Sequence, residues 1–508
     1  MPAETKTIKN VVLIEPKAPG FHVFSRYKLP RLGLPLLGAV LEQELGISVK
    51  IYFQECAKID WDAVSNADMV GISTITSTAP AAYGLVERIK RTTDATVVMG
   101  GPHVTFLPEE ALEKGADFIV RGEGEKSIVE LIKCLQGDAD ALGLRVIAGL
   151  SYREDGEIVN NVEREWIGDL SSLPWPKLSL IQGFEKRAIM PIMTSRGCPF
   201  NCKFCTVTSL FGRKYRFRET EDVLAELESL YALYPKAIFF FYDDNFTANP
   251  EHTKQLLRRM KEKGITPRWT AQTRVEVVHD EELMTLMEET GCLFLYLGLE
   301  SANPETLKAY RKSQTVEDIE HAVEVIHKHK IKVHGMFVMG SDEDDKESIR
   351  ETVRFAKRTG IDTVQFMILT PIPGSETYED MCREGRIFVH DWTKFSGQHV
   401  VFRPKKMAPY RLQKEAGIKA TKKFYSIAQC WRLGLMFRWR DMAIRIYGHR
   451  TLIKWKSRNR YYVSELKHRY KAERAHKKQE VRDLEESGAT TKADRKRKGS
   501  ETEQPVRA

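Results

Sequence analysis

The strongest constraint on the fold of this 508-residue chain is a repeated alternation of short apolar runs with helical patterns. The first series of β-branched runs predicts five strands, at residues 11–16, 49–53, 69–74, 96–101 and 117–122. Strands separated by helices join through right-handed crossovers into an open parallel sheet. We therefore predict an α/β, Rossmann-like domain over residues 1–145.

A second series predicts six further strands, at residues 190–197, 237–245, 268–274, 293–301, 332–340 and 363–371. With helical segments between them, they form six βα repeats, fewer than the eight of a full barrel but enough for a partial, open TIM-type barrel. We place this barrel at residues 186–400, after a linker at 146–185 that holds a hairpin-like turn and a Pro-rich stretch. In both units we expect ligands beyond the carboxyl ends of the strands.

The C-terminal part differs in composition from the rest. A helical, aromatic-rich pattern predicts a helical region over 401–470, and the composition beyond it cannot bury a core, so we predict a disordered charged tail over 471–508. The chain carries a net charge of +9, but residues 421–508 hold 24 basic and 10 acidic residues, a net of +14, which leaves −5 for the rest. Attraction to anionic partners is therefore expected of the C-terminal part alone.

Composition also constrains the compartment. No apolar run approaches the ~18 residues that span a bilayer, and the first residues lack the apolar stretch of a signal peptide. Eight cysteines in so long a chain are too few for a disulfide scaffold. These features predict a cytoplasmic protein. Peripheral attachment to the inner face of the membrane is compatible with this prediction.

The most specific chemical signal is the C-x3-C-x2-C run formed by Cys198, Cys202 and Cys205, directly after the first strand of the second series. Core packing does not require three thiols so close together. A closed structural zinc site needs four ligands, and the sequence has no histidine between His103 and His252 to supply a local fourth one. An iron–sulfur cluster held by three cysteines leaves one iron open for a substrate, so we favour a cluster over zinc.

This motif, placed after the first strand of a partial barrel and with the aromatic Phe204 before its last cysteine, resembles the radical S-adenosylmethionine (SAM) superfamily. The resemblance implies a 4Fe-4S cluster held by Cys198, Cys202 and Cys205, with the SAM amino and carboxylate groups on the open iron. One electron, from a donor such as flavodoxin or ferredoxin, would then cleave SAM to methionine and a 5′-deoxyadenosyl radical. The protein would supply orientation and exclude water.

The same resemblance assigns supporting roles to residues at strand ends. Asp243 and Asp244 would meet the SAM amino group, Arg274 its carboxylate, and Glu300 and Ser301 the ribose or amino groups. The complete set of predicted SAM-binding residues is Phe204, Asp243, Gln272, Arg274, Glu300, Ser301, Met336, Val338 and Ile372. The alternative for each is an ordinary ion pair or core residue.

The N-terminal unit resembles the cobalamin-binding domain that precedes the barrel in a large radical SAM subgroup. Its small residues at strand ends would let backbone approach the cofactor closely, and tight turns are the alternative. The predicted cobalamin-binding residues are Ser73, Thr74, Thr76, Ser77, Gly100, Gly101, Pro102 and Glu123. No D-x-H-x-x-G sequence is present, so an axial histidine is not expected, and a fold that shapes a substrate cavity without cobalamin is a further alternative.

Together the resemblances imply an enzyme that methylates an unactivated carbon of a hydrophobic small molecule, such as a lipid or a tetrapyrrole. Radical oxidation, cyclisation or carbon–carbon coupling is the alternative within the enzyme class, and a non-catalytic cobalamin or redox sensor is the alternative outside it. Residues 425–440 mix Trp, Phe and Leu with Arg, which fits a membrane surface or packing on the barrel. A nucleic-acid arm is the least favoured of these partners.

Overall fold

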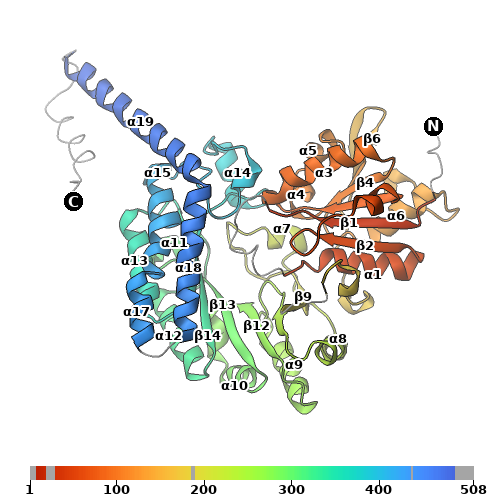
Figure 1. The fold of residues 1–508 in the computed structure, drawn as a ribbon, viewed down its shortest axis with the longest axis horizontal. Coiled ribbons are helices and arrows are strands. Elements are labelled where there is room, and N and C mark those ends of the chain that lie inside the picture. Colours follow the sequence, from red (N-terminus) through yellow and green to blue (C-terminus); the bar gives the residue numbers. More distant parts are fainter. Residues whose placement is uncertain (1–6, 19–28, 185–188, 436–438, 487–508) are drawn as a thin grey trace.

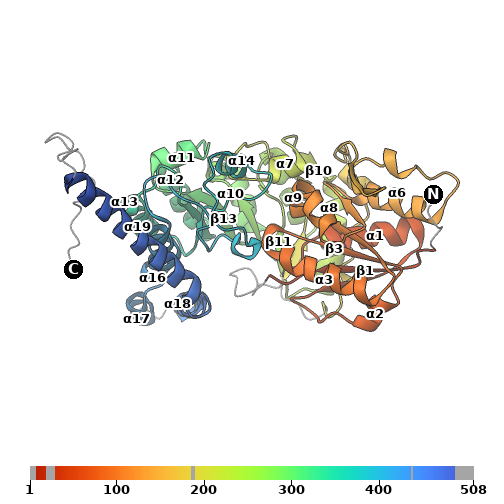
Figure 2. The ribbon, with the colours of Figure 1, turned by 90° about the horizontal axis from the view of Figure 1, so that it is seen from above.

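The computed structural model describes residues 7–18, 29–184, 189–435 and 439–486. Two α/β units lie side by side, the N-terminal one in red and orange and the second in yellow to cyan, and a group of C-terminal helices covers the far side of the second unit (Figure 1). Seen from above, the molecule is elongated along the line that joins the two units (Figure 2).

The N-terminal unit has a seven-stranded sheet in the order β2-β1-β3-β4-β5-β6-β7. Its first five strands are parallel and confirm the predicted series: β1 Asn10–Glu15, β2 Ser48–Phe53, β3 Met69–Ser73, β4 Thr96–Gly100 and β5 Phe118–Val120. The longer helices of this unit are α1 Gly33–Leu45, α3 Ala79–Thr92 and α6 Glu125–Gln136.

The last two strands of this sheet come from the segment that the sequence analysis treated as a linker. Strands β6 Leu150–Glu154 and β7 Glu157–Asn160 form an antiparallel hairpin that extends the sheet beyond β5. Asp155 and Gly156, both with positive φ, form its two-residue turn, which matches the right-handed twist of the strands. The segment therefore contributes to the N-terminal sheet as well as connecting the units.

The second unit is a partial barrel with strand order β15-β14-β13-β12-β11-β8, and every neighbouring pair is parallel. All six predicted strands are present: β8 Ile189–Ile192, β11 Ile238–Phe241, β12 Arg268–Thr273, β13 Cys292–Glu300, β14 Lys332–Met339 and β15 Thr363–Ile368. The outer helices are α8 Thr220–Leu233, α9 Pro250–Glu262, α10 Glu281–Glu289, α12 Val316–Lys328 and α13 Lys346–Arg358.

Local sequence explains where the barrel helices begin. Asp280 and Asn249 cap α10 and α9 by accepting a backbone N–H, and Thr315 and Asp345 form capping boxes at α12 and α13. Each such cap stabilises its helix by about 1 kcal/mol. The caps end the loops at fixed residues and so define the strand ends at which the candidate site lies.

Short elements complete the loops at the carboxyl ends of the barrel strands. Strands β9 Ser195–Arg196 and β10 Arg216–Phe217 pair antiparallel, and between them lies α7 Val207–Phe211. Helices α11 Pro304–Ala309 and α14 Glu376–Arg383 follow β13 and β15.

The predicted C-terminal helical region is present as α17 Ile427–Leu435, α18 Trp439–Arg458 and α19 Arg460–Glu486. The expected disorder from residue 471 is wrong for 471–486, because α19 continues to Glu486. Its Lys, Arg and Glu residues are good helix formers, and pairs such as Arg469–Glu465 and His476–Glu480 support it at i,i+4 spacing. The rest of the expected tail, 487–508, lies outside the described residues. Within the described residues, no helix is long and apolar enough to cross a membrane.

The two units share their interior. One cluster of buried apolar residues extends from Ile8 in the N-terminal unit, through the barrel strands, to Tyr425. Trp392, beyond β15, crosses to the first unit, where its Nε1 donates to Glu110 at 2.9 Å and its ring lies 5.1 Å from that of His103. The units are therefore joined by packed side chains as well as by the chain.

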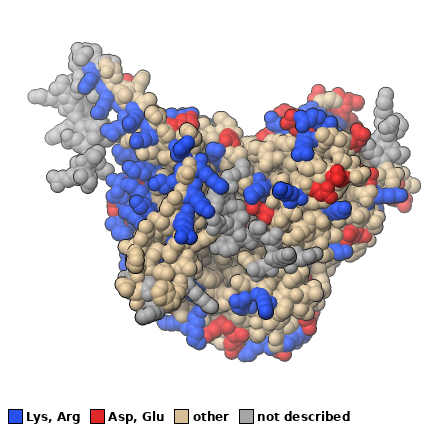
Figure 3. Space-filling model, in the orientation of Figure 1, with Lys and Arg blue, Asp and Glu red and all other residues tan. Residues whose placement is uncertain are grey.

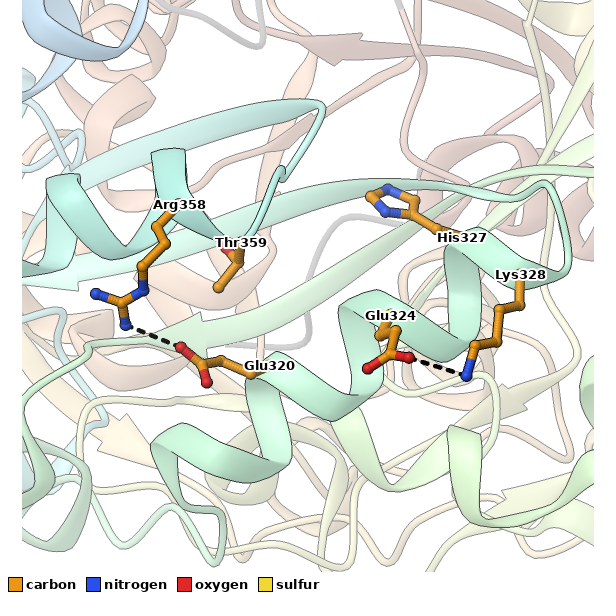
Figure 4. Close-up of a pocket in the computed structure, with 6 residues that line it drawn as sticks. All are labelled: Glu320, Glu324, His327, Lys328, Arg358 and Thr359. Carbon is orange, nitrogen blue, oxygen red and sulfur yellow. Dashed lines mark hydrogen bonds and ion pairs between the residues drawn. The ribbon is translucent and has the colours of Figure 1, made fainter.

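A surface hollow of about 630 Å³ lies on the outer face of the barrel, between α12 and α13 (Figure 4). Its charged groups face one another in pairs: Arg358 with Glu320 and Lys328 with Glu324. It lies among the outer helices, away from the carboxyl ends of the strands where the cysteines are found, and its charges already compensate each other.

Candidate active site

The three motif cysteines lie in the loop that follows β8 and β9, at the carboxyl end of the barrel strands. All three are half-buried and free of disulfides. The loop begins at Gly197, whose φ is +91° and where a Cβ would lie 2.8 Å from the Lys214 carbonyl oxygen. Only glycine fits so close an approach, so Gly197 fixes the point at which the chain turns towards Cys198.

The chemistry of these thiols fits the implied cluster. Burial raises the pKa of Cys198, and it raises the pKa of Cys205 to about 12, so ionisation here requires a compensating positive charge, as iron would supply. Within the described residues, no group of three or more His, Cys, Asp or Glu side chains is placed to hold a single metal ion. A four-iron cluster is wider than one ion and binds each cysteine through a different iron.

Arg274, at the end of β12, faces this loop. Its guanidinium lies 3.8 Å from the centre of the Phe200 ring, within the cysteine motif. Its Nη2 pairs with Glu276 at 2.7 Å, whereas its Nη1 is buried and has no hydrogen-bond partner among the residues that the structure describes. An unpaired buried N–H is costly, and a carboxylate at this position would satisfy it. The arrangement fits the predicted contact with the SAM carboxylate.

The structure separates the roles of two neighbouring aspartates at the end of β11. Asp243 is buried and accepts hydrogen bonds from the Thr194 N–H at 3.1 Å, the Thr194 hydroxyl at 2.9 Å and the Ser195 hydroxyl. It therefore holds the start of the cysteine loop, and its predicted contact with SAM stays a prediction. Asp244 is open to solvent at the same strand end, although surrounding protein and then the charge of Asp243 raise its pKa to about 7.

Glu300 and Ser301, at the end of β13, are both buried. Glu300 adopts a left-handed backbone conformation, φ 61°, at a β-bulge and pairs with Lys312 Nζ at 2.8 Å. A Cβ on Gly298 would lie 2.8 Å from both charged groups, so this glycine makes room for the pair. Lys312 was not predicted as a site residue; a lysine 12 positions beyond a strand-end glutamate gives no spacing signal.

The remaining predicted SAM positions lie on the same side of the barrel. Phe204 packs edge-to-face on Tyr310 with ring centres 5.0 Å apart. Met336 and Ile372 are partly exposed, whereas Val338 is buried. Gln272 Nε2 lies 3.5 Å from the Asp243 carbonyl oxygen. The barrel topology thus brings the predicted SAM-binding residues to the carboxyl ends of the strands or the loops beyond them, except Met336, which lies within β14 three residues before its end. Their individual contacts stay predictions.

The predicted cobalamin-binding residues also gather at one edge, beyond β3, β4 and β5. Ser73, Gly100, Gly101 and Pro102 are partly exposed there, and Thr74, Thr76 and Ser77 are buried. The Thr74 N–H donates to the Gly100 carbonyl at 2.9 Å, which ties the two loops together. Beside them lie the buried Nδ1 of His103, which has no hydrogen-bond partner in the described part of the chain, and Gly122, where no described atom lies within 4 Å of an added Cβ. The small, uncharged residues leave room for a large cofactor, and the amide groups of cobalamin could hydrogen-bond to His103 Nδ1.

Glu123 differs from the other residues of this edge. Its carboxylate is buried and paired with Arg196 and Arg216 of the barrel unit. Burial acts to raise the pKa of Glu123, but the hydrogen bond from Arg216 and the charge of Arg196 outweigh it, and the pKa is lowered. These arginines were not identified from the sequence, since partners 73 and 93 positions away share no local pattern. A direct contact of Glu123 with cobalamin stays a prediction.

Comparisons with known proteins agree with this arrangement. A family model described as the radical SAM superfamily matches residues 192–356, and one described as a B12 binding domain matches 24–132. An uncharacterized methyltransferase, PH0819, of Pyrococcus horikoshii is 34% identical over 380 residues, 72% of this chain and 82% of that protein. The bacteriochlorophyllide d C-12(1)-methyltransferase of Chlorobaculum tepidum is 30% identical over 356 residues, 68% of this chain and 73% of the relative.

Two solved structures share the fold. The radical SAM methyltransferase TsrM from Kitasatospora setae, with cobalamin and a [4Fe-4S] cluster bound, aligns with a TM-score of 0.62 at 21% identity over 74% of this chain and 78% of the other. The cobalamin-dependent radical enzyme OxsB, with aqua-cobalamin and SAM bound, aligns with a TM-score of 0.67 at 16% identity over 95% and 82%.

A parallel-sheet domain before a partial barrel, with three cysteines at the barrel's carboxyl end, defines a class of radical enzymes. The chain belongs to the radical SAM superfamily, in the subgroup whose members carry an N-terminal cobalamin-binding domain. Membership implies a 4Fe-4S cluster, SAM and cobalamin as its cofactors, which confirms the prediction from the motifs.

Proposed function

We propose that this enzyme methylates an unactivated carbon of a hydrophobic small molecule, such as a lipid or a tetrapyrrole. One observation carries the proposal. The cysteine loop of the barrel and the predicted cobalamin edge beyond β3, β4 and β5 belong to two units that are joined by buried contacts. When bound, the cluster and SAM supply a carbon-centred radical and cobalamin supplies a transferable methyl group. Arg274 would bind the SAM carboxylate, Glu300 and Ser301 would orient its ribose or amino group, and Asp243 would hold the cysteine loop.

The inner face of the barrel supports a hydrophobic substrate. Residues Phe240, Tyr242, Tyr296 and His334 alternate with fully buried neighbours along β11, β13 and β14 and are partly exposed to the interior. The Tyr296 ring lies 5.7 Å from that of Phe240 and 4.8 Å from that of His334. Burial lowers the pKa of His334 to about 4, so it is neutral at pH 7. An uncharged aromatic lining favours an apolar, planar or chain-like guest.

The names of two relatives also point to hydrophobic tetrapyrrole substrates. Besides the bacteriochlorophyllide methyltransferase, an anaerobic magnesium-protoporphyrin IX monomethyl ester cyclase of Cereibacter sphaeroides is 29% identical over 353 residues, 66% of this chain and 56% of that protein. The cyclase's name also keeps open the alternative that the same radical performs cyclisation or oxidation without methylation.

Anaerobic reconstitution tests the proposal. With iron, sulfide and cobalamin supplied, the chain should bind about four irons and one cobalt and release 5′-deoxyadenosine from SAM under a one-electron reductant. Cys198→Ala, Cys202→Ala and Cys205→Ala should each abolish SAM cleavage, and Cys382→Ala, an exposed cysteine outside the motif, should leave it unchanged. A wild-type chain that binds both cofactors and cleaves no SAM would favour the non-catalytic sensor instead.

The electron must reach the cluster from outside, and we propose a small flavodoxin- or ferredoxin-type donor. A hollow of about 240 Å³ lined by Cys202, Cys205 and Lys203 opens at the cysteine loop. It would let a donor approach the cysteine loop from the surface. Reduced flavodoxin should replace a chemical reductant in the SAM-cleavage assay. Cleavage that proceeds with the chemical reductant and with neither protein donor would contradict this part of the proposal.

We further propose that the C-terminal helices contact an anionic membrane surface. Ile427, Trp431 and Leu435 lie at i,i+4 spacing on α17, and each is more than half exposed. Residues 421–464 hold eleven Lys and Arg and one acidic residue. In Figure 3 an area without charge lies at the lower left, where Figure 1 places α17, and Lys and Arg gather above it along α18 and α19. Exposed apolar residues beside basic ones are typical of interfacial helices.

Vesicle co-sedimentation tests this contact. The chain should bind vesicles of phosphatidylcholine and phosphatidylglycerol at 3:1, and binding should weaken on vesicles of phosphatidylcholine alone and at high salt. The double variant Trp431→Ser/Leu435→Ser should lose most of the binding. Leu233→Ser, which removes an equally exposed apolar side chain from α8, is the matched control. Binding that is independent of lipid charge and of α17 would contradict the proposal.

A further inference from the structure

Two arginines next to the cysteine loop cross to the N-terminal unit. Arg196, in β9 and two residues before Cys198, places Nη1 at 3.0 Å from Glu123 Oε1 and Nη2 at 2.6 Å from Glu125 Oε1. Glu123 lies in the loop beyond β5 and Glu125 is the first residue of α6, at the edge where the cobalamin-binding residues gather. One guanidinium therefore bridges two carboxylates of the other unit.

Arg216 completes the arrangement from the neighbouring strand. It pairs with Arg196 in the β9–β10 ladder, and its Nη1 lies 2.9 Å from Glu123 Oε2. The same Nη1 donates to the Ile167 carbonyl at 2.7 Å, and the Ile167 N–H donates to Glu123 at 2.7 Å. We call Arg196, Arg216, Glu123 and Glu125 the interdomain ion network.

The network is buried and its charges balance, although Glu123 Oε1, Glu125 Oε2 and Arg216 Nε make no hydrogen bond with the described residues. Each of its four side chains is less than a tenth exposed, and two positive charges face two negative ones. Buried charges are stable only when they are paired with good geometry. Because each unit contributes charges of one sign, neither can separate or slide without leaving charges uncompensated. An apolar contact would tolerate sliding, whereas the forked geometry of arginine selects one relative position.

We propose that Arg196 is a positioning residue that fixes the cysteine loop at one distance and orientation from the cofactor edge of the N-terminal unit. The inference rests on the proposed function in one respect, that both edges hold redox cofactors that must meet one substrate. The link is short: one residue, Gly197, lies between Arg196 and Cys198, and Glu123 lies three residues beyond the end of β5. A small displacement at a reacting centre lowers the rate steeply, which gives the network a reason to be rigid.

Hydrogen–deuterium exchange on the full chain without cofactors tests the network itself. Arg196→Lys keeps the charge and loses the fork, so exchange should accelerate ~10-fold in residues 119–131 and 195–217 and stay unchanged in β13 and β14. Arg213→Lys, an exposed arginine of the same loop, is the matched control. If Arg196→Lys exchanges like the wild type in both segments, the network does not join the units and the inference fails.

Electron paramagnetic resonance on the loaded protein tests the positioning. The reduced cluster and cob(II)alamin each carry an unpaired electron, so their dipolar coupling reports the distance between them. We expect one narrow coupling in the wild type and in Arg213→Lys, and a broadened one in Arg196→Lys. An unchanged coupling in Arg196→Lys would overturn the positioning role.

A third variant guards against loss of folding. Glu125→Gln removes only one arm of the network and leaves Glu123 paired with both arginines, so it should give an intermediate broadening. No difference between Glu125→Gln and wild type, in coupling or in exchange, would also count against the inference. Failure of the proposed function is distinct from this, because a wild type that binds no cofactor gives no coupling, while the exchange experiment still reports on the network.

Discussion

At the scale of single residues, the buried pair Glu300 and Lys312 shows how much the site depends on local charge balance. Both side chains are less than a tenth exposed, 2.8 Å apart. Gln314 Nε2 donates to the Gly298 and Leu299 carbonyls beside them and so holds the bulge at which Glu300 turns inward. In the structure without cofactors, the Glu300 carboxylate is paired with Lys312. To contact SAM as predicted, Glu300 would have to share this ion pair or give it up.

Removing one member of the pair should destabilise the chain. Glu300→Gln leaves the Lys312 ammonium buried without a counter-charge, at a cost of about 3–5 kcal/mol. The double variant Glu300→Gln/Lys312→Met removes both charges and should recover most of that loss. Urea unfolding of the cofactor-free chain measures both. A double variant no more stable than the single one would show that the two groups are not coupled.

A second residue-scale prediction concerns pH. Burial raises the pKa of Asp243 from its ordinary 3.8 to about 6, against the hydrogen bonds from Ser195 and Thr194. Between these values the folded chain holds a proton on Asp243 that the unfolded chain has released, so the contribution of Asp243 to stability falls as pH rises from about 4 to about 6 and is level above that. Asp244, whose pKa is raised to about 7, adds a fall of the same sign at slightly higher pH. The fall due to Asp243 amounts to ~3 kcal/mol. Asp243→Asn should lose the part that Asp243 contributes and show a smaller fall than the wild type, measured by thermal unfolding of the cofactor-free chain at pH 4.5 and 7.5; parallel pH profiles for variant and wild type would contradict the assignment.

At the scale of elements, the loop beyond β4 illustrates a constraint of backbone on backbone. Gly101 has φ +94°, and a Cβ there would lie 2.7 Å from the Thr74 carbonyl oxygen and 2.9 Å from its nitrogen. The loops beyond β3 and β4 can approach each other this closely because one of them carries no side chain at that point. The shape of the predicted cobalamin edge depends on this contact.

Gly101→Ala should therefore cost ~2–4 kcal/mol in folding stability, from strain at positive φ and from overlap. It should also weaken cobalamin binding measured by visible absorbance. Gly33→Ala is the matched control: Gly33 begins α1, and no atom of the described residues lies within 4 Å of the added Cβ, so stability should change by less than about 0.5 kcal/mol. Equal effects of the two substitutions would show that the close approach is not a constraint.

Most helices and strands were predictable from the sequence, whereas the contacts between residues far apart in the sequence were not. All eleven strands of the two predicted series are present, because buried parallel strands are continuous β-branched or aromatic runs. The β6–β7 hairpin was assigned to the linker although its Asp155-Gly156 turn is a strong hairpin signal. The first part of the expected tail is helical, because helix propensity does not require a core. The cysteine motif was identified because its residues are adjacent in sequence, whereas Arg196 and Glu123 meet only after two domains have folded.

At the scale of the whole molecule, Trp392, in the segment beyond β15, forms one of the contacts between the barrel and the N-terminal unit. Its indole donates to Glu110 and packs near His103, which in turn lies 3.1 Å from the Tyr83 hydroxyl. Glu110 and His103 therefore contact the Trp392 ring directly, and Tyr83 supports His103 from behind. This contact and the interdomain ion network join the same two units through different chemistry, one aromatic and one charged.

Trp392→Ala should loosen the units without unfolding either one. In calorimetry of the cofactor-free chain, we expect the unfolding transition to broaden or to resolve into two, because the N-terminal unit loses an aromatic contact and Glu110 loses its donor. Trp392→Phe, which keeps the ring and loses the N–H, should give a smaller effect. A single, equally sharp transition in Trp392→Ala would contradict a joining role for this residue.

The apolar cluster that continues from Ile8 to Tyr425 bears on how the chain can be divided. Expressing the barrel by itself would expose apolar residues that are buried in the intact chain, and a fragment with this exposed apolar surface would tend to aggregate. Dissection of this enzyme is therefore better done by point substitution in the intact polypeptide than by making fragments.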